Sequence, residues 1–301
     1  MTVLSERITT NDNAFIQDEF TKSLLSRSLK YVKTGYPVHF IGPSGSGKTS
    51  IAIALANKLK RPVMLMHGNH ELDNKDLIGS FSGYTSSKVV DQYVRSVYKK
   101  DETVTESWKD GRLLEAVKNG YTLIYDEFSR SRPATNNIFL SILEEGILPL
   151  YGLKSNRPYV KVHPKFNIIF TSNPNEYAGV YQTQDALLDR LITLYVCYKS
   201  KQEETFILSE KIGIEENEAT IISSLVQDVR KEFHERHGAP SIRTTIQIAK
   251  IAKNDDIPIK GSNQDFLQLC IDLLSNSVVQ GLEITYEDAS DLIRELCKKT
   301  T

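Results

Sequence analysis

The chain has 301 residues, of which 25% are charged, and its formal net charge at pH 7 is −1. This length suggests one large domain plus a smaller one, and the near-neutral charge argues against a strong basic field for nucleic acid. The chain has no apolar run long enough for a membrane helix, and segment 1–20 is polar and of mixed charge, unlike a signal peptide. We therefore expect a cytoplasmic protein without membrane insertion.

Short β-rich runs alternate with helical patterns over the first two thirds of the chain. A helical pattern at 20–33 ends before Gly35, and β-rich runs follow at 38–41, 63–66, 121–125, 167–171 and 192–197. Such alternation predicts an α/β fold, with a parallel sheet between layers of helices. Two segments interrupt it: an insert at 68–111, expected to be a long loop, and a β-hairpin at 147–162.

The last third of the chain has a helical pattern throughout. Helices are expected at 203–211, 216–236, 241–253, 263–279 and 286–297. This change of composition predicts a domain boundary near residue 200, with an α/β domain over 1–200 and an all-α domain over 201–301.

Residues 42–49 read Gly-Pro-Ser-Gly-Ser-Gly-Lys-Thr, the pattern of a phosphate-binding loop. A β-rich run precedes it and an Ala- and Leu-rich helix follows, so the loop's N–H groups are expected to face an anion. Lys48 can reach the β- and γ-phosphates, and the Thr49 hydroxyl can bind Mg²⁺. The alternative is a glycine-rich turn that binds nothing. The predicted nucleotide-binding residues here are Gly42, Pro43, Ser44, Gly45, Ser46, Gly47, Lys48, Thr49 and Ser50.

Two later β-rich runs end in polar residues. Asp126 and Glu127 follow the run at 121–125, and Asn173 follows the run at 167–171. Because a doubly wound sheet binds ligands at the carboxyl ends of its strands, Asp126 is expected to bind Mg²⁺ and Glu127 to act as the general base. Asn173 is expected to orient the water or contact the γ-phosphate. The alternatives are an acidic loop and an asparagine that turns the chain before Pro174.

Two arginines complete the candidate site. Arg190 ends a short helical segment before the fifth β-rich run, and Arg243 opens a helix for which Ser241 is the expected N-cap. Arg190 can act as an arginine finger on a neighbouring subunit's nucleotide, and Arg243 can close the helical domain onto the γ-phosphate. The alternatives are a local ion pair of Arg190 with Asp185 or Asp189, and an ordinary exposed Arg243.

These elements, in this order, resemble the AAA+ P-loop NTPases. Asp126-Glu-Phe-Ser-Arg130, followed by the hairpin and by Thr171-Ser-Asn-Pro, is similar to the MoxR branch of that class. Runs such as Pro37-Val-His-Phe and Asp76-Leu-Ile-Gly-Ser resemble the gas vesicle members of that branch. The resemblance implies a sheet order of 5-1-4-3-2, a helical lid, ATP with Mg²⁺, and a ring that is usually a homohexamer.

The same resemblance implies a Mg²⁺-dependent ATPase that remodels or chaperones a protein partner. That partner would be the gas vesicle shell protein or another gas vesicle assembly protein, and the ATPase would be located at gas vesicles. Two other classes stay open, a non-catalytic ATP-dependent assembly switch or scaffold and, with less support, a nucleic-acid motor on the same fold. Glu127 argues against the switch, and the net charge argues against the motor.

The resemblance also suggests roles outside these motifs. Arg130 and Arg132 would lie at a subunit interface, the alternative being an ion pair with Glu127 or a neighbouring acid. The adenine is expected near 30–37, with Tyr36 as the candidate contact.

The insert at 68–111 lies where such rings present pore loops. Its candidates for gripping a polypeptide are Tyr84, Lys88 and Tyr93, and the alternative is a solvated or interface loop.

Overall fold

Five parallel strands in the order β2-β5-β8-β1-β9 form the central sheet of the computed structural model. The structure describes residues 18–88, 102–150, 158–173, 179–234 and 236–300. The strands are β1 (Val38–Ile41), β2 (Val63–His67), β5 (Thr122–Asp126), β8 (Asn167–Ser172) and β9 (Ile192–Tyr195). Numbered one to five along the chain and read from β9, this order is 5-1-4-3-2. The predicted AAA+ sheet is therefore confirmed.

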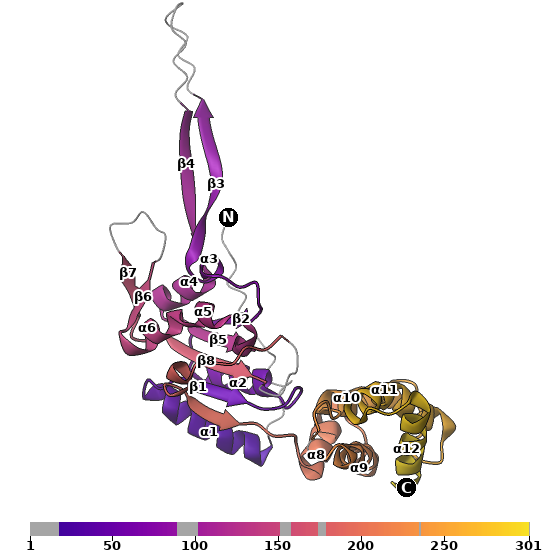
Figure 1. Cartoon of the computed structure of the whole chain (residues 1–301). Coiled ribbons are helices and arrows are strands. Elements are labelled where there is room, and N and C mark those ends of the chain that lie inside the picture. The colour runs from indigo at the N-terminus through magenta and orange to yellow at the C-terminus, as the bar shows by residue number, and fades with distance from the viewer. Residues whose placement is uncertain (1–17, 89–101, 151–157, 174–178, 235, 301) are drawn as a thin grey trace, which may run out of the picture.

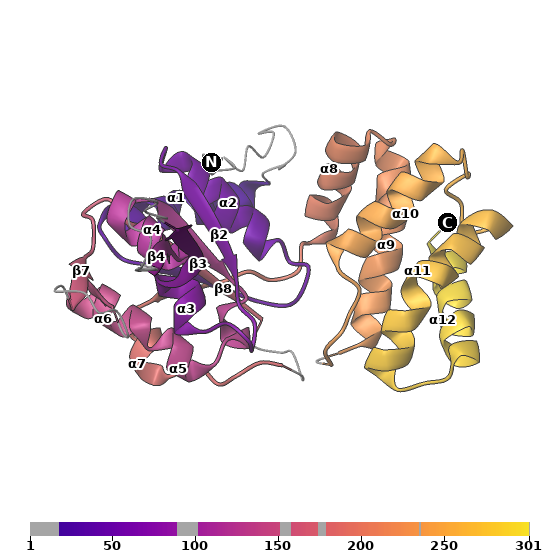
Figure 2. The same ribbon diagram turned by 90° about the horizontal axis from the view of Figure 1, so that it is seen from above.

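Alternating side chains give the sheet two apolar faces. On β5, Leu123 and Tyr125 join one buried cluster, whereas Ile124 between them joins the other. The cluster around Ile124 is covered by α1 (Glu19–Lys33) and α2 (Lys48–Lys58). The opposite layer contains α3 (Asn74–Ile78), α4 (Arg112–Asn119), α5 (Pro133–Asn136), α6 (Ile138–Glu144) and α7 (Asp185–Leu188). Figure 2 shows α1 and α2 on one side, and α5 and α6 on the other.

The insert at 68–111 is not the long loop that was predicted. After α3, the strands β3 (Gly79–Lys88) and β4 (Glu102–Asp110) pair antiparallel and form a ribbon that projects from the sheet (Figure 1). The sequence of these two strands lacks the alternating apolar pattern that predicts a strand. Trp108 at the base of the ribbon packs against the cluster that contains Leu123.

The candidate gripping residues lie on this insert. Tyr84 and Lys88 are described only by their backbone positions, in register with Glu106 and Glu102, and Tyr93 lies outside the described residues. Their role stays a prediction.

The predicted hairpin at 147–162 is confirmed by two short antiparallel strands, β6 (Ile147–Pro149) and β7 (Tyr159–Lys161). Buried Leu148 joins the cluster around Leu123 and anchors the hairpin to the body. Residues 151–157 lie outside the described part.

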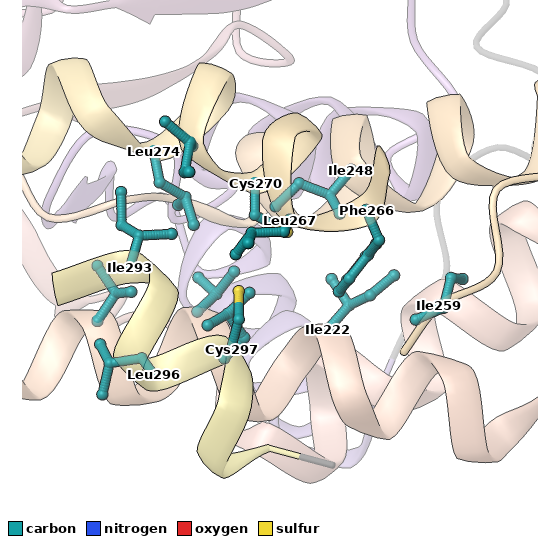
Figure 3. Packing of buried hydrophobic residues seen from close by; sticks show 14 of the residues in the cluster. Ile222, Ile248, Ile259, Phe266, Leu267, Cys270, Leu274, Ile293, Leu296 and Cys297 are labelled. Atoms are coloured by element: carbon teal, nitrogen blue, oxygen red, sulfur yellow. The ribbon is translucent and has the colours of Figure 1, made fainter. Parts of the chain in front are cut away.

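The C-terminal part is built from the five predicted helices and has its own apolar core. They are α8 (Lys201–Ile212), α9 (Glu216–Glu232), α10 (Ile242–Asn254), α11 (Gln264–Leu282) and α12 (Tyr286–Lys299). Helix α9 ends before the predicted position 236, because His234 takes a left-handed φ of +48°. Figure 3 shows Ile222 and Phe266 toward one end of this core and Ile293 toward the other, with Cys270 and Cys297 between them. The boundary near residue 200 stays a prediction.

Among the described residues, no helix combines the length and the apolar character needed to cross a membrane.

Candidate nucleotide-binding site

The phosphate-binding loop joins β1 to α2, and its glycines are required by its geometry. Gly45 and Gly47 have φ angles of +73° and +94°, in the left-handed region that favours glycine. A Cβ on Gly42 would lie 2.1 Å from the carbonyl oxygen of Val196, which follows β9. The loop is therefore tightly curved and seated against the end of the sheet.

Two side chains at the start of α2 turn toward this loop and the neighbouring strand. Lys48 is buried, and its ammonium donates to the carbonyl oxygens of Gly42 at 2.9 Å and Pro43 at 2.7 Å. Thr49 donates its hydroxyl to Asp126 Oδ1 at 2.8 Å. These bonds place a cation and a hydroxyl group at the N-terminus of α2, where an anion is favoured.

Asp126 and Glu127 are positioned by a threonine that the sequence analysis did not identify. The Thr171 hydroxyl on β8 donates to Asp126 Oδ1, which also accepts from Thr49. The same Thr171 oxygen accepts from the Glu127 N–H at 2.9 Å. The other carboxylate oxygen of Asp126 lies 3.4 Å from His67 Nδ1 at the end of β2. The acidic pair thus lies at the carboxyl ends of three neighbouring strands.

One cavity of about 260 Å³ brings most of the predicted site residues together. They come from the loop, from two strand ends and from the start of α10. Those that line it are Ser44, Gly45, Ser46, Gly47, Lys48, Thr49, Ser50, Asp126, Glu127, Asn173 and Arg243. Gly42 and Pro43 are not among its lining residues, although both accept hydrogen bonds from Lys48. The catalytic roles of these residues remain predictions.

The donor set of this cavity suits a magnesium nucleotide. The Thr49 hydroxyl oxygen and Asp126 Oδ1 lie 2.8 Å apart, and Asp126 is buried. Both are hard oxygen ligands, the type that Mg²⁺ prefers. Within the described part of the chain, the buried Ser46 hydroxyl in the loop has no hydrogen-bond partner. A phosphate oxygen would provide one.

Sequence analysis missed the far end of the cavity. Its walls there are Thr21 of α1, Lys199 of the β9–α8 linker, Ile207 and Lys211 of α8, and Ile242 and Ile246 of α10. Tyr36, the predicted adenine contact, is 59% exposed and is not among the residues that line this cavity, so its role stays a prediction. Thr21, near the start of α1, lines the cavity, whereas the end of α1 does not. Ile207, Ile242 and Ile246 look in the sequence like ordinary apolar residues on the face of a helix.

Two contacts connect the helical part to the sheet around this cavity. A Cβ on Gly45 would lie 2.3 Å from Ser241 Cβ, so the N-cap of α10 rests directly on the phosphate-binding loop. Lys199 forms a buried ion pair with Asp18, the N-cap of α1, and donates to Thr21 Oγ1 at 2.7 Å. The Lys199 ammonium thus fastens the linker before α8 to α1, and Ser241 brings the start of α10 close to the loop.

Arg190 lies outside this cavity. Its guanidinium binds Glu144 at the end of α6 and the carbonyl oxygen of Ala186. The alternative prediction, an ion pair of Arg190 with Asp185 or Asp189, is therefore wrong. The finger role remains a prediction.

Arg130 pairs with Glu127, with 2.8 Å between Arg130 Nε and Glu127 Oε2. The sequence analysis gave two interpretations of Arg130, a contact at a subunit interface and an ion pair with Glu127 or a neighbouring acid. The ion pair with Glu127 is present within a single chain. Arg132 is an exposed residue at the N-cap of α5.

Comparison with known proteins agrees with this fold and cavity. Residues 37–191 match the family "AAA domain (dynein-related subfamily)". A mutant of RuvB from Thermotoga maritima has a TM-score of 0.52 at 16% identity, covering 91% of this chain and 85% of that chain. This likeness concerns the fold alone. The fold, the cavity and the family match define an ATPase of the AAA+ class.

Two curated relatives narrow the assignment. The gas vesicle ATPase GvpN of Ancylobacter aquaticus is 41% identical over 269 residues, covering 89% of this chain and 75% of that protein. The gas vesicle ATPase GvpN of Haloferax mediterranei is 36% identical over 283 residues, covering 93% of this chain and 80% of that protein. The chain therefore belongs to the GvpN family of AAA+ ATPases, which confirms the resemblance that the motifs indicated.

Proposed function

We propose that this ATPase depends on Mg²⁺ and uses ATP hydrolysis to remodel or chaperone a protein partner during gas vesicle assembly or growth. The observation that carries the proposal is the convergence of Lys48, Asp126, Glu127 and Arg243 on one cavity. The names of its relatives point to gas vesicles as the setting. We place the activity in the cytoplasm, on the vesicle shell protein or another assembly protein.

The phosphates of ATP would lie along the loop at the N-terminus of α2. Lys48 would exchange its bonds to the loop carbonyls for the β- and γ-phosphate oxygens, which are stronger acceptors because they are charged. Thr49 and Asp126 would hold Mg²⁺, which when bound neutralises phosphate charge. The Thr171 hydroxyl, which donates to Asp126 Oδ1, would keep this carboxylate turned toward Thr49.

Glu127 would act on the water that attacks the γ-phosphorus. Its carboxylate takes a proton from that water, a bond forms between the water oxygen and phosphorus, and the bond from phosphorus to the β-phosphate oxygen breaks. The Thr171 hydroxyl holds the backbone of Glu127, and Asn173 lines the same cavity, where its amide can orient the water. ADP and inorganic phosphate are the products.

We further propose that the protein acts as a ring, with a homohexamer as the expected state. Arg190 does not line its own cavity and is paired with Glu144, so as a finger it would serve the nucleotide of a neighbouring copy. Arg243 would respond to the γ-phosphate of its own chain. The α/β domain over 1–200 and the helical domain over 201–301 would then rock against each other as the nucleotide changes.

Glu127→Gln tests the proposal, because glutamine keeps the shape of the side chain and cannot accept the proton. We expect ATP binding to persist, measured by calorimetry, and phosphate release to fall by about 10²- to 10⁴-fold. Glu287→Gln on the exposed side of α12 is the matched control and should change neither.

The same variants test the cellular role. Cells that carry Glu127→Gln should fail to form gas vesicles, and turnover of the wild type should respond to added shell protein. Normal vesicles with the inactive variant would mean that ATP acts as an assembly switch and that remodelling by hydrolysis is wrong.

A further inference from the structure

The glutamate assigned as general base is already paired with a cation. Glu127 and Arg130 form an ion pair at 2.8 Å, and their side chains are 42% and 39% exposed. Glu127 lines the nucleotide cavity, whereas Arg130 is not among the described residues that do so. The pair thus lies at the rim of the cavity, with the acid inside and the cation outside.

Local backbone structure produces this pair. Glu127 has a left-handed φ of +52° and is followed by one 3₁₀ turn, Phe128–Arg130, in which the Arg130 N–H donates to the Glu127 carbonyl at 2.9 Å. Residues three apart lie on the same side of such a turn, so the two side chains meet without any change of the backbone.

This turn is held in place from both ends. The Glu127 N–H donates to Thr171 Oγ1 at 2.9 Å, and the Asn136 amide donates to the Phe128 carbonyl at 3.1 Å. The Tyr125 hydroxyl donates to Ser131 Oγ at 2.6 Å just beyond the turn. With the backbone fixed, the Glu127 carboxylate can change its direction only by rotating its side chain, and that side chain is paired with Arg130.

A general base must direct a free oxygen toward the proton that it removes. Guanidinium is always charged, and its hydrogen bonds orient a carboxylate. We infer that Arg130 is a positioning residue that holds Glu127 in a resting pose, and that ATP hydrolysis requires this ion pair to open. The inference rests on the proposed role of Glu127.

The exposure of the pair sets the size of the effect. Ion pairs exposed to this degree shift an equilibrium by a factor of at most about five. Arg130 therefore restrains the reaction without blocking it, and the pair opens spontaneously during each cycle.

Arg130→Gln in the full-length chain tests the inference. At saturating ATP and Mg²⁺ we expect kcat to rise about two- to fivefold. KM for ATP should stay unchanged, because Arg130 does not line the cavity. Arg130→Lys keeps a cation and should return kcat toward the wild-type value.

Arg294→Gln is the matched control, because it removes another surface arginine paired with an acid three residues away, Asp291 on α12. It should leave kcat and KM unchanged. The double variant of Glu127→Gln with Arg130→Gln should show no gain over Glu127→Gln alone.

An unchanged or lower kcat in Arg130→Gln, with an unchanged melting temperature, would overturn the inference. An equal gain in Arg294→Gln would also overturn it, since the effect would then come from lost surface charge. The proposed function fails separately: if Glu127→Gln itself retains turnover, Glu127 is not the base. If Glu127→Gln loses turnover and Arg130→Gln gives no gain, only the restraint by Arg130 is wrong.

Discussion

Mild acid should destabilise this protein through His39 on β1, an inner strand of the central sheet. The ring is 1% exposed and packs edge-on against Phe128, with 5.2 Å between the ring centroids. Its two nitrogens pair with hydroxyl groups on both neighbouring strands, Ser172 Oγ at 2.7 Å and Thr193 Oγ1 at 3.2 Å. Burial of the ring lowers the pKa of His39 from 6.5 to about 4.

The sign and the size of the effect follow from this difference. Because the folded protein resists protonation of His39, its contribution to stability is fully present above pH 6.5 and is lost as the pH falls toward 4. At about 1.36 kcal/mol for each unit of pKa difference, the loss between about pH 7.5 and about pH 5 is about 2 kcal/mol.

Urea unfolding of the wild type and of His39→Gln at both pH values measures this loss. Glutamine can still donate and accept hydrogen bonds near Ser172 and Thr193, but it does not titrate. All carboxylates are common to both proteins, so their titration cancels in the comparison. We expect the free energy of unfolding to fall by about 2 kcal/mol more in the wild type than in the variant. Equal losses in the two proteins would refute the reasoning.

Two further substitutions test other contacts. Gly45→Ala should weaken ATP binding about 5- to 30-fold, because alanine at a φ of +73° costs about 1–2 kcal/mol and its Cβ would overlap Ser241. Calorimetry measures this loss, and Gly146→Ala, with a φ of +65° and open space around it, should bind ATP normally. Glu204→Ala should destabilise the helical part by about 3–5 kcal/mol, because it leaves buried Arg230 without its partner at 2.7 Å. Thermal unfolding measures it, and adding Arg230→Met should recover much of the loss; no recovery would mean that the charge is not the cause.

The sheet and the phosphate-binding half of the cavity could be predicted from the sequence because each depends on local patterns. A buried parallel strand is a short apolar run, and a tight loop around phosphate needs glycine at particular positions, such as Gly45 and Gly47. Asp126 and Glu127 were found for the same reason, since they directly follow an apolar run.

The other half of the cavity depends on contacts between distant segments. Thr21, Lys199 and Ile207 come from three elements and belong to common residue types, so nothing in the sequence shows that they share a wall. The partner of Arg190 was missed for a similar reason, since Glu144 comes from α6 and not from the turn around Arg190. The ribbon was missed because Gly79–Lys88 and Glu102–Asp110 contain few apolar residues and show no regular alternation of apolar and polar positions.

The ribbon is connected through α3 to the end of β2, which lies next to Asp126. β2 ends at His67, which lies in register with Asp126. The N–H of the next residue, Gly68, donates to the Asp126 carbonyl oxygen at 2.8 Å. Further along the chain, α3 leads into β3. From Gly79 to Lys88, β3 is about 31 Å long, at about 3.4 Å for each residue. A tilt of about 5° at its root would carry the outer end through about 3 Å. The ribbon is thus a long arm that connects through α3 to the strand end beside Asp126, and a slight rotation at its root displaces its outer end by several ångströms.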